Sequence, residues 1–309
     1  MSKVLVVFGA TGNQGGSVVD SVLGDAALSQ EYKIRAVTRD TSTPAALHLQ
    51  QKKVEVVTGN ADDTPSVEKA VQGAHTVFFL TTTTYDDKLE EREVSQGKRI
   101  ADAAVAAGAK YLIFSTLPSI SENSGGRYNK GGHFDCKTQV EKYIRTLPVK
   151  SAFFAPGCFM QNLATNMRPN ATDDGTYVLA NVASPTTKLP LIDITDTGKY
   201  VSAILADPDA FEGKVLCAAT RLYSIEEMVG IISKVTGKTV RHRQLPEDVF
   251  RQHMPPTMAD YIVHMLLYIQ DFGYYGKDTE ELVAWTARQA RGKLHSLEDY
   301  LAENPLELN

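Results

Sequence analysis

The chain has 309 residues, of which 43% are hydrophobic and 22% are charged, as in an ordinary globular protein. This length predicts one large α/β unit or two interlocked lobes. The net charge of −5 and the pI near 5.8 argue against a surface that coats nucleic acid. The short basic runs also disfavour a localisation signal or a polybasic membrane patch.

Cysteine usage and apolar segments indicate the compartment. Cys136, Cys158 and Cys217 are widely spaced and odd in number, which disfavours a disulfide framework or a structural zinc site. The apolar run Val4–Phe8 is too short for the core of a signal peptide, and Tyr261–Ile269 is far shorter than the ~20 residues of a membrane helix. We therefore expect an intracellular, reducing compartment, cytoplasmic or nuclear, with no metal and no membrane partner.

The first half of the chain alternates between short apolar runs and amphipathic segments. The predicted strands are Val4–Phe8, Lys33–Thr38, Val54–Thr58, Thr76–Leu80, Lys110–Phe114 and Lys150–Ala155. The predicted helices are Gly15–Leu28, Pro44–Gln51, one capped by Thr64 with Pro65 at its first position, Lys88–Ala107 and His133–Arg145. Ser115–Gly132 is predicted to be a loop. Successive strand–helix units of this length predict a Rossmann-type doubly wound parallel sheet.

Beyond Gly157 the pattern becomes irregular. We predict a hairpin near Tyr177–Asn181, and helices at Thr197–Ala206, Ile225–Val235, Pro246–Gln252, Met258–Gln270 and Ser296–Glu303. The chain is therefore expected to divide into a Rossmann domain over residues 1–156, to which some later segments return, and a smaller α/β substrate or partner lobe over residues 157–309.

A glycine-rich loop follows the first predicted strand directly. It has the sequence Gly9-Ala10-Thr11-Gly12-Asn13-Gln14-Gly15 and opens the first helix. Gly9 allows a tight turn, Gly12 a close approach of the backbone to a ligand, and Gly15 close packing of the helix on the strand. The free N–H groups of a helix N-terminus attract a pyrophosphate. A glycine-rich turn without a ligand is the alternative, but its place after the first strand of an α/β chain favours dinucleotide binding.

The end of the second strand distinguishes between dinucleotides. NAD-preferring sites usually place an acidic residue there, on the ribose 2′-hydroxyl. Here Thr38 leaves that position neutral, and Arg39 offers a guanidinium to the 2′-phosphate of NADP(H). Asp40 is a complication, since it could hold Arg39 in a local ion pair. The sequence therefore favours NADP(H) over NAD(H).

Further short motifs are spread over both halves of the chain. They are Val6–Gly16, Ala36–Asp40, Gly59–Asp63, His133–Lys137, Pro156–Leu163 and Asp193–Gly198. Together they resemble the NmrA-like branch of the atypical short-chain dehydrogenase/reductase superfamily. This resemblance implies a Rossmann domain with a small α/β lobe, NADP(H) binding and, in several members, redox-responsive regulation of a protein partner.

The resemblance also implies roles for individual residues. Arg39 would contact the 2′-phosphate, and Asp62 and Asp63 would border the adenine, although a helix cap explains the two aspartates equally well. Thr81 and Thr82 would line the cofactor cleft or simply form a polar loop. Pro156 and Cys158 follow the sixth strand, near the nicotinamide end, where Cys158 is either redox-active or a small buried thiol.

The catalytic positions depart from the superfamily pattern. Short-chain reductases use a Tyr and, four residues later, a Lys on the same helix face. This chain keeps Lys137, which could hold the nicotinamide ribose, but has His133 in place of the Tyr. His133 is either a proton donor, because its unperturbed pKa is ~6.5, or a packing residue. Ser115 is a further candidate for a hydroxyl that polarises the substrate.

Two functions agree with these residues. The first is an NADP(H)-binding, redox-responsive regulator that acts through a protein partner. The second is an NADPH-dependent reductase of a quinone, ketone, imine or similar small electrophile, with Lys137 and a proton donor other than Tyr. No motif indicates a particular partner, substrate or oligomeric state.

Overall fold

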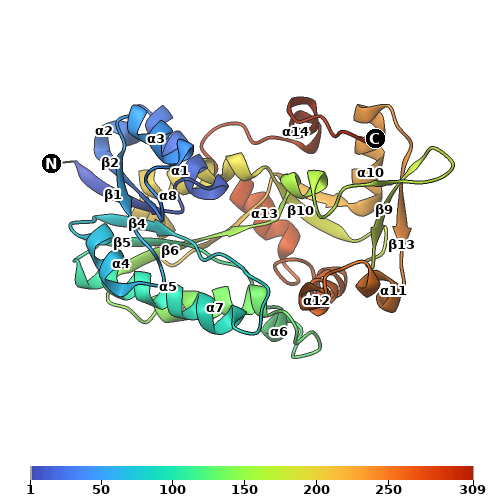
Figure 1. Ribbon diagram of the computed structural model, residues 1–309, viewed down its shortest axis with the longest axis horizontal. Helices are drawn as coiled ribbons and strands as arrows, with labels where there is room; N and C mark the ends of the chain where they lie inside the picture. The colour runs from blue at the N-terminus through green and yellow to red at the C-terminus, as the bar shows by residue number, and fades with distance from the viewer. Residues whose placement is uncertain (1, 309) are drawn as a thin grey trace.

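The computed structural model describes residues 2–308, which are built around a seven-stranded parallel sheet (Figure 1). The sheet order is β11-β6-β5-β4-β1-β2-β3. Its strands are β1 (Lys3–Phe8), β2 (Tyr32–Thr38), β3 (Glu55–Thr58), β4 (Thr76–Phe79), β5 (Tyr111–Ser115), β6 (Lys150–Pro156) and β11 (Val215–Ala218). The predicted doubly wound Rossmann-type fold is confirmed.

Helices cover both faces of this sheet, because its strands are apolar on both sides. On one face lie α1 (Asn13–Gly24) and α8 (Thr197–Ala206); on the other lie α4 (Thr64–Val71), α5 (Leu89–Ala106) and α7 (Gly132–Ile144). Leu5 and Val7 of β1 pack toward α1 and α8, while Val6 and Phe8 pack toward the opposite layer. Two shorter helices, α2 (Leu28–Glu31) and α3 (Pro44–Gln51), flank β2.

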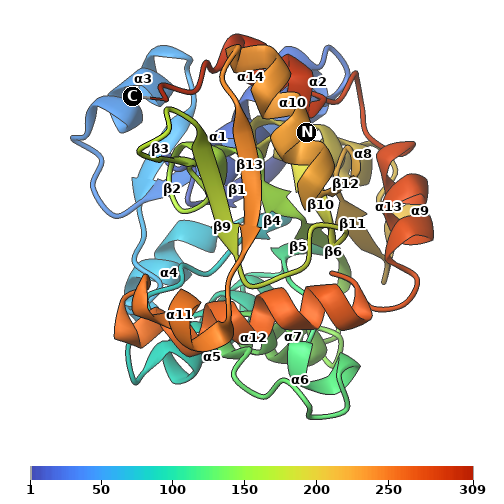
Figure 2. The same ribbon diagram turned by 90° about the vertical axis from the view of Figure 1, so that its right-hand side faces the viewer.

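The second half of the chain supplies two small sheets and most of the remaining helices (Figure 2). One sheet holds β12 (Arg221–Ser224), β10 (Lys188–Ile192) and β7 (Cys158–Phe159), and the other holds β13 (Val240–Gln244), β9 (Tyr177–Asn181) and β8 (Asn170–Ala171). The helical elements are η1 (Met160–Ala164), η2 (Ile194–Asp196), α9 (Pro208–Phe211), α10 (Ile225–Thr236), α11 (Glu247–Gln252), α12 (Pro256–Phe272), α13 (Thr279–Ala287) and α14 (Leu297–Glu303). We call the part around the two small sheets the second lobe.

Several boundaries differ from those predicted. The first helix ends at Gly24 because Asp25 is extended, and the Asp25 carboxylate accepts the N–H groups of Ala27 and Leu28 at 3.0 Å, which starts α2. The cap of α4 is Asp63 instead of Thr64, since the Asp63 carboxylate accepts the Ser66 N–H at 3.1 Å.

Later elements also differ from prediction. The predicted loop 115–132 contains a short helix, α6 (Ile120–Asn123). The predicted hairpin is present as the antiparallel pair β8–β9, whereas β7, β10, β11, β12 and β13 have no counterpart among the predicted strands.

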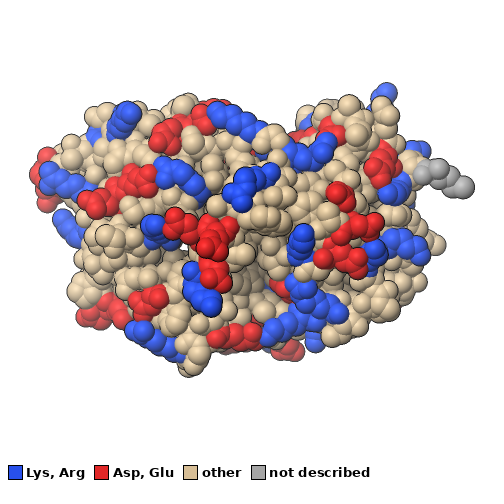
Figure 3. All heavy atoms as spheres, turned by 180° about the vertical axis from the view of Figure 1, so that it is seen from behind, with Lys and Arg blue, Asp and Glu red and all other residues tan. Residues whose placement is uncertain are grey.

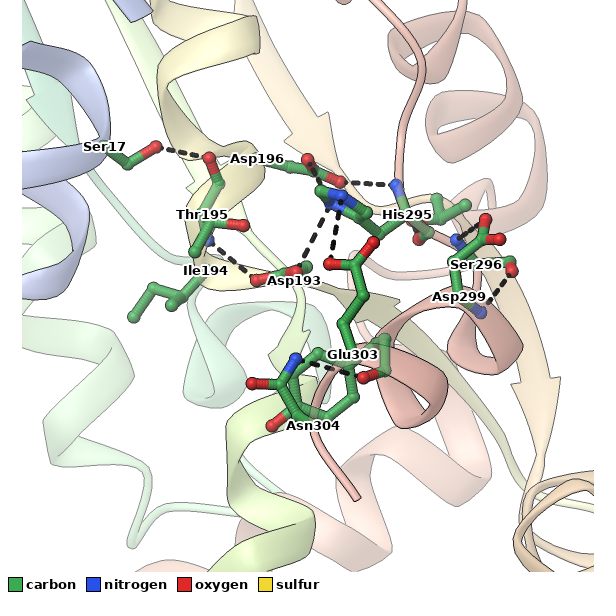
Figure 4. A network of polar contacts seen from close by, with 12 residues as sticks. Ser17, Asp193, Ile194, Thr195, Asp196, His295, Ser296, Asp299, Glu303 and Asn304 are labelled. Atoms are coloured by element: carbon green, nitrogen blue, oxygen red, sulfur yellow. Dashed lines mark hydrogen bonds and ion pairs between the residues drawn. The ribbon is translucent and has the colours of Figure 1, made fainter. Parts of the chain in front are cut away.

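A buried polar network joins the C-terminal segment to the start of α8 (Figure 4). The Asp196 carboxylate is fully buried and accepts the backbone N–H of His295 at 2.8 Å. It also pairs with His295 Nδ1 at 2.9 Å and Lys199 Nζ at 2.6 Å. A buried carboxylate needs such partners to offset its desolvation, so the network fixes η2 in one position.

The turn formed by η2 and the start of α8 is hydrogen-bonded to α1. Ser17 Oγ donates to the Thr195 carbonyl at 2.6 Å and accepts the Gly198 N–H at 2.8 Å. A Cβ at Gly198 would lie 2.1 Å from the Ser17 carbonyl oxygen, so only glycine allows this close approach. These contacts hold α1, the helix that follows the glycine-rich loop, against residues 195–198, which lie far away in the sequence.

Charged side chains of both signs are interspersed on the face seen in Figure 3. Among residues 2–308, none of the helices combines the length and the apolar character that crossing a membrane requires.

Candidate functional site

The glycine-rich loop links the carboxyl end of β1 to α1 in the tight form that its sequence predicts. Gly9 has a φ of +66°, and its carbonyl accepts the Gly12 N–H at 2.9 Å. A Cβ at Gly15 would lie 2.3 Å from the Gly9 carbonyl oxygen. The residue before α1 is Gly12, which has no side chain to cap the helix, so the first-turn N–H groups remain open to an anion.

An open groove of about 700 Å³ runs from this loop past the ends of β2 and β3. Its walls include most of the predicted cofactor-binding residues: Gly9, Thr11, Gly12, Asn13, Gln14, Gly15, Arg39, Asp62 and Thr82. The sequence interpretation missed other members of the same walls, including Asn60, Thr84, Arg92, Gln96 and Ile194. Ile194 belongs to η2, the turn whose Thr195 carbonyl accepts a hydrogen bond from Ser17. This turn therefore forms part of the groove wall.

At the end of β2, Arg39 is exposed on the groove wall. The Asp40 carboxylate accepts the Ser42 N–H at 2.8 Å and the Ser42 hydroxyl at 2.6 Å, and these bonds lower the pKa of Asp40. Within residues 2–308 Arg39 takes part in no ion pair. The local pair with Asp40 that the sequence left open is therefore absent from this part of the chain.

The neighbouring residues Asp62 and Asp63 lie in different surroundings. Asp62 lies on the groove wall and accepts a hydrogen bond from Gln96 Nε2 at 2.8 Å. Asp63 lies outside the groove lining and caps α4.

A cavity of about 380 Å³ adjoins the groove. Gln14 and Leu80 line both spaces, so groove and cavity meet beside the start of α1. The cavity walls contain the predicted site residues Thr81, Ser115, His133, Lys137, Pro156 and Cys158. Many of its apolar lining residues come from α11, α12 and the turn between them, namely Phe250, Met254, Met258, Ile262, Met265, Leu266 and Ile269.

Lys137 is held by a residue that the sequence interpretation missed. Its Nζ lies 2.5 Å from Glu93 Oε2 and donates to Thr81 Oγ1 at 3.0 Å and to the Thr81 carbonyl at 3.4 Å. The Glu93 side chain is fully buried, and its other oxygen accepts the Thr83 hydroxyl at 2.8 Å. Glu93 shares the buried face of α5 with Gly97 and Ile100, at helical spacings of four and seven. This spacing in the sequence indicates that Glu93 is buried.

His133 packs into a cluster of aromatic rings. The ring centroids of Tyr85 and Tyr261 each lie 5.7 Å from that of His133, and Phe134 lies at 4.8 Å. Both His133 nitrogens are buried without a hydrogen-bond partner among residues 2–308. Burial, and to a lesser extent the charge of Lys137, lowers the pKa of His133 to about 3. This corrects the expectation that its pKa suits proton transfer near neutrality, because the imidazole is neutral there.

Two smaller groups complete the cavity. Ser115 ends β5, and its hydroxyl donates to Gln14 Oε1 at 2.9 Å, at the junction with the groove. The Cys158 thiol lies 3.7 Å from both Asn162 Nδ2 and Met167 Sδ, and burial raises its pKa. Cys158 therefore remains a protonated thiol near neutrality, as expected of a packing residue.

The site thus combines two spaces of different character. One is an open polar groove that begins at an anion-binding helix N-terminus. The other is a largely apolar cavity, and Gln14, Ser115 and Lys137 are among its polar lining residues. Such an arrangement can hold a long phosphate-containing ligand and a small apolar ligand in contact with each other.

Known proteins are similar to this chain in sequence. An NmrA-like family domain-containing protein of Dictyostelium discoideum is 30% identical over 252 residues, covering 79% of this chain and 80% of the relative. The NmrA-like family domain-containing oxidoreductase FrzB of a Cladobotryum species is 29% identical over 305 residues, covering 91% and 88%.

Solved structures extend the likeness. A crystal structure of NmrA, a negative transcriptional regulator, covers 98% of this chain and 96% of its own, with a TM-score of 0.81 and 23% identity. A triphenylmethane reductase of a Citrobacter species covers 97% and 99%, with a TM-score of 0.75 and 20% identity. The model of the NmrA-like family matches residues 1–301. The chain therefore belongs to the NmrA-like family.

Proposed function

We propose that the chain binds NADP(H) in the groove and uses it to reduce a small, neutral, apolar electrophile in the adjoining cavity. The observation that carries the proposal is the junction of the two spaces at Gln14, Leu80 and Ser115. A groove alone would support only cofactor binding, whereas a largely apolar cavity beside it supplies a place for a second reactant.

The residues of the groove fit a phosphorylated dinucleotide. The uncapped N-terminus of α1 suits the pyrophosphate, and the exposed guanidinium of Arg39 suits the 2′-phosphate. Proteins of the same fold support this assignment, since structures of NmrA in complex with NADP and of the Citrobacter reductase complexed with NADP(H) are known. NAD(H) lacks the group that Arg39 would bind, so we expect it to bind more weakly.

The cavity indicates the class of electrophile. Among its lining residues, all of which lie in the described part of the chain, Lys137 alone is charged, and Glu93 neutralises it. A charged substrate would therefore lose its hydration without gaining a counter-ion. The volume and apolar walls suit an uncharged quinone, ketone, imine or similar molecule. Several relatives bear the name oxidoreductase, which supports turnover.

The reaction needs a hydride, a proton and a dry site. When bound, NADPH supplies the hydride. The apolar residues of α11 and α12 limit the access of water to the cavity. The Ser115 hydroxyl donates to Gln14 Oε1 in the free protein, and we expect it to turn from Gln14 to donate to the substrate oxygen or nitrogen. Water from the groove side then restores the proton that Ser115 passes on. His133 is neutral and contributes shape instead of a proton.

A second candidate function is a redox-responsive regulator that acts through a protein partner. It is favoured by the absence of a phenol at position 133 and by the engagement of Lys137 with Glu93 and Thr81. In this case the cofactor binds but the cavity performs no rapid turnover.

Calorimetry and a turnover screen test the proposal together. We expect NADPH and NADP⁺ to bind at least several times more tightly than NADH and NAD⁺, and NADPH oxidation to be accelerated by neutral quinones or ketones. Ala180 lines the cavity but not the groove, so Ala180→Phe should abolish turnover and leave NADPH affinity unchanged. Tight cofactor binding without accelerated NADPH oxidation would favour the regulator. Absence of dinucleotide binding would refute both the reductase and the regulator.

A further inference from the structure

Glu93 is a buried carboxylate for which the proposed reaction has no direct use. It lies in the middle of α5, fully buried, and its oxygens contact Lys137 Nζ, the Thr81 hydroxyl and the Thr83 hydroxyl. Removing a carboxylate from water is costly, and its ion pair only partly offsets that cost, so an apolar residue would serve packing better. The position of the pair points to a role in the ligand site.

The Glu93–Lys137 pair lies where the groove meets the cavity. Lys137 Nζ contacts two oxygens of Thr81, which lines the cavity, and both chain neighbours of Thr81, Leu80 and Thr82, line the groove. Lys137 itself lines the cavity. If the proposed function is right, the nicotinamide reaches this same junction.

The charge balance of this junction matters because the two forms of the cofactor differ in charge there. The ring of NADP⁺ is a pyridinium with one positive charge, and the ring of NADPH is neutral. An uncompensated Lys137 ammonium would repel the oxidised ring and leave the reduced ring nearly unaffected. Because the opposite charge of Glu93 lies 2.5 Å from the ammonium, the pair is neutral as a whole.

We propose that Glu93 sets the relative affinity for oxidised and reduced cofactor by cancelling the charge of Lys137 beside the nicotinamide. Glu93 is thus a specificity-determining residue that acts through Lys137 and does not touch the substrate. The inference rests on the proposed NADP(H) site but applies equally to an enzyme and to a regulator. It predicts that the parent protein accepts NADP⁺ and NADPH with comparable affinities.

The central test is calorimetry of Glu93→Gln with NADP⁺ and NADPH at pH 8. Glutamine keeps the shape and a hydrogen bond to Lys137 but removes the negative charge. Coulomb's law, for unit charges about 6–12 Å apart at an effective dielectric constant of ~20, predicts that NADP⁺ binds roughly ten- to a hundredfold more weakly. NADPH affinity should stay within about threefold, because its ring is uncharged.

Two controls separate charge from structure. Glu91→Gln makes the same change on an exposed position of α5 and should leave the NADP⁺/NADPH ratio unchanged. Glu93→Asp keeps the charge and should restore a ratio within about threefold of the parent. Equal weakening of both cofactors in Glu93→Gln, or an unchanged ratio, would overturn the inference and show that Glu93 is structural.

A complementary variant keeps the inference testable if Glu93→Gln does not fold. Lys137→Gln removes the ammonium and leaves Glu93 its hydrogen bonds from the hydroxyls of Thr81 and Thr83, and the two cofactors are again compared at pH 8. The ratio should then move the other way, with NADP⁺ gaining at least about threefold over NADPH, and an unchanged or reversed ratio would contradict the inference. If the parent binds neither cofactor, the proposed function itself has failed.

Discussion

The groove and the cavity meet at Gln14 and Leu80, yet they are built in different ways. The groove is made mainly from the ends of neighbouring parallel strands and one helix N-terminus, all from the first half of the chain apart from Ile194. The cavity is lined by side chains from both halves, and many of its apolar residues come from α11 and α12. The comparison indicates that cofactor binding belongs to the Rossmann framework, while the choice of second ligand belongs to the later segments.

The largest expected effect is a loss of cofactor affinity in the groove when the glycine-rich loop is changed. Gly15→Val introduces a Cβ that would lie 2.3 Å from the Gly9 carbonyl oxygen, so the loop must open and lose its anion-binding form. We expect NADPH to bind at least about 100-fold more weakly by calorimetry, since several N–H contacts are lost together.

Gly16→Ala is the matched control for this change. Its Cβ would lie 3.5 Å from the Ala10 carbonyl oxygen, which is an ordinary contact. NADPH affinity should therefore stay within about threefold, and an equal loss in both variants would show that the geometry of the loop is not what binds the cofactor.

Arg39 tests the far end of the groove. Arg39→Ala removes a charge-assisted contact worth about 1.5–3 kcal/mol, so NADPH should bind roughly ten- to a hundredfold more weakly while NADH affinity stays constant. Lys33→Ala removes the same charge from an exposed position of β2 outside the groove and is the control. An equal effect of Arg39→Ala on NADPH and NADH affinity would contradict the proposal that Arg39 binds the 2′-phosphate.

These first two predictions concern residues whose surroundings depend on nearby parts of the sequence. The turn at Gly9, the close contact at Gly15 and the exposed Arg39 depend on residues near them in the chain. The fold class follows from the same alternation of strands and helices. The cap at Asp63 instead of Thr64 shows that even local signals fix a boundary only to within a residue.

The cavity could not be predicted in the same way. Glu93 meets Lys137 only because α5 and α7 pack side by side, and Gly97 permits that approach to Val140. His133 keeps the helical spacing to Lys137, but its low pKa comes from burial among Tyr85 and Tyr261, which lie far apart in sequence. Long-range packing therefore decides the chemistry of the cavity.

His133 gives a prediction of pH-dependent stability. Its folded-state pKa of about 3 lies below the unfolded value of ~6.5, so the unfolded chain binds an extra proton as the pH falls below 6.5. This lowers the free energy of unfolding by about 2 kcal/mol between pH 6.5 and 4.5. His133→Phe, measured by urea unfolding at both pH values, should lose that much less stability.

The exposed His48 offers a comparison for this change. His48→Gln should retain the acid sensitivity of the parent. If His133→Phe retains it as well, the imidazole is not buried in its neutral form.

The smallest expected effect concerns the link between the two halves. Ser17→Ala removes the hydrogen bonds to the Thr195 carbonyl and from the Gly198 N–H, and should lower the free energy of unfolding by about 1 kcal/mol. Because η2 also places Ile194 on the groove, NADPH affinity should fall by about threefold. Ser29→Ala, at an exposed position of α2, should change neither quantity.

The most direct test of hydride transfer between groove and cavity uses NADPH deuterated at the nicotinamide C4 and a neutral ketone or imine, because the transferred deuterium then stays bound to carbon. The comparison is between the parent protein and Ala180→Phe, with NADPH affinity measured for both. We predict labelled product from the parent, and in the variant a loss of at least about 100-fold in transfer with unchanged NADPH affinity, because the phenyl ring occupies space in the cavity that the substrate needs while the groove is intact. Equal transfer by both proteins, or no transfer by the parent to any neutral ketone or imine despite tight NADPH binding, would contradict hydride transfer in the cavity.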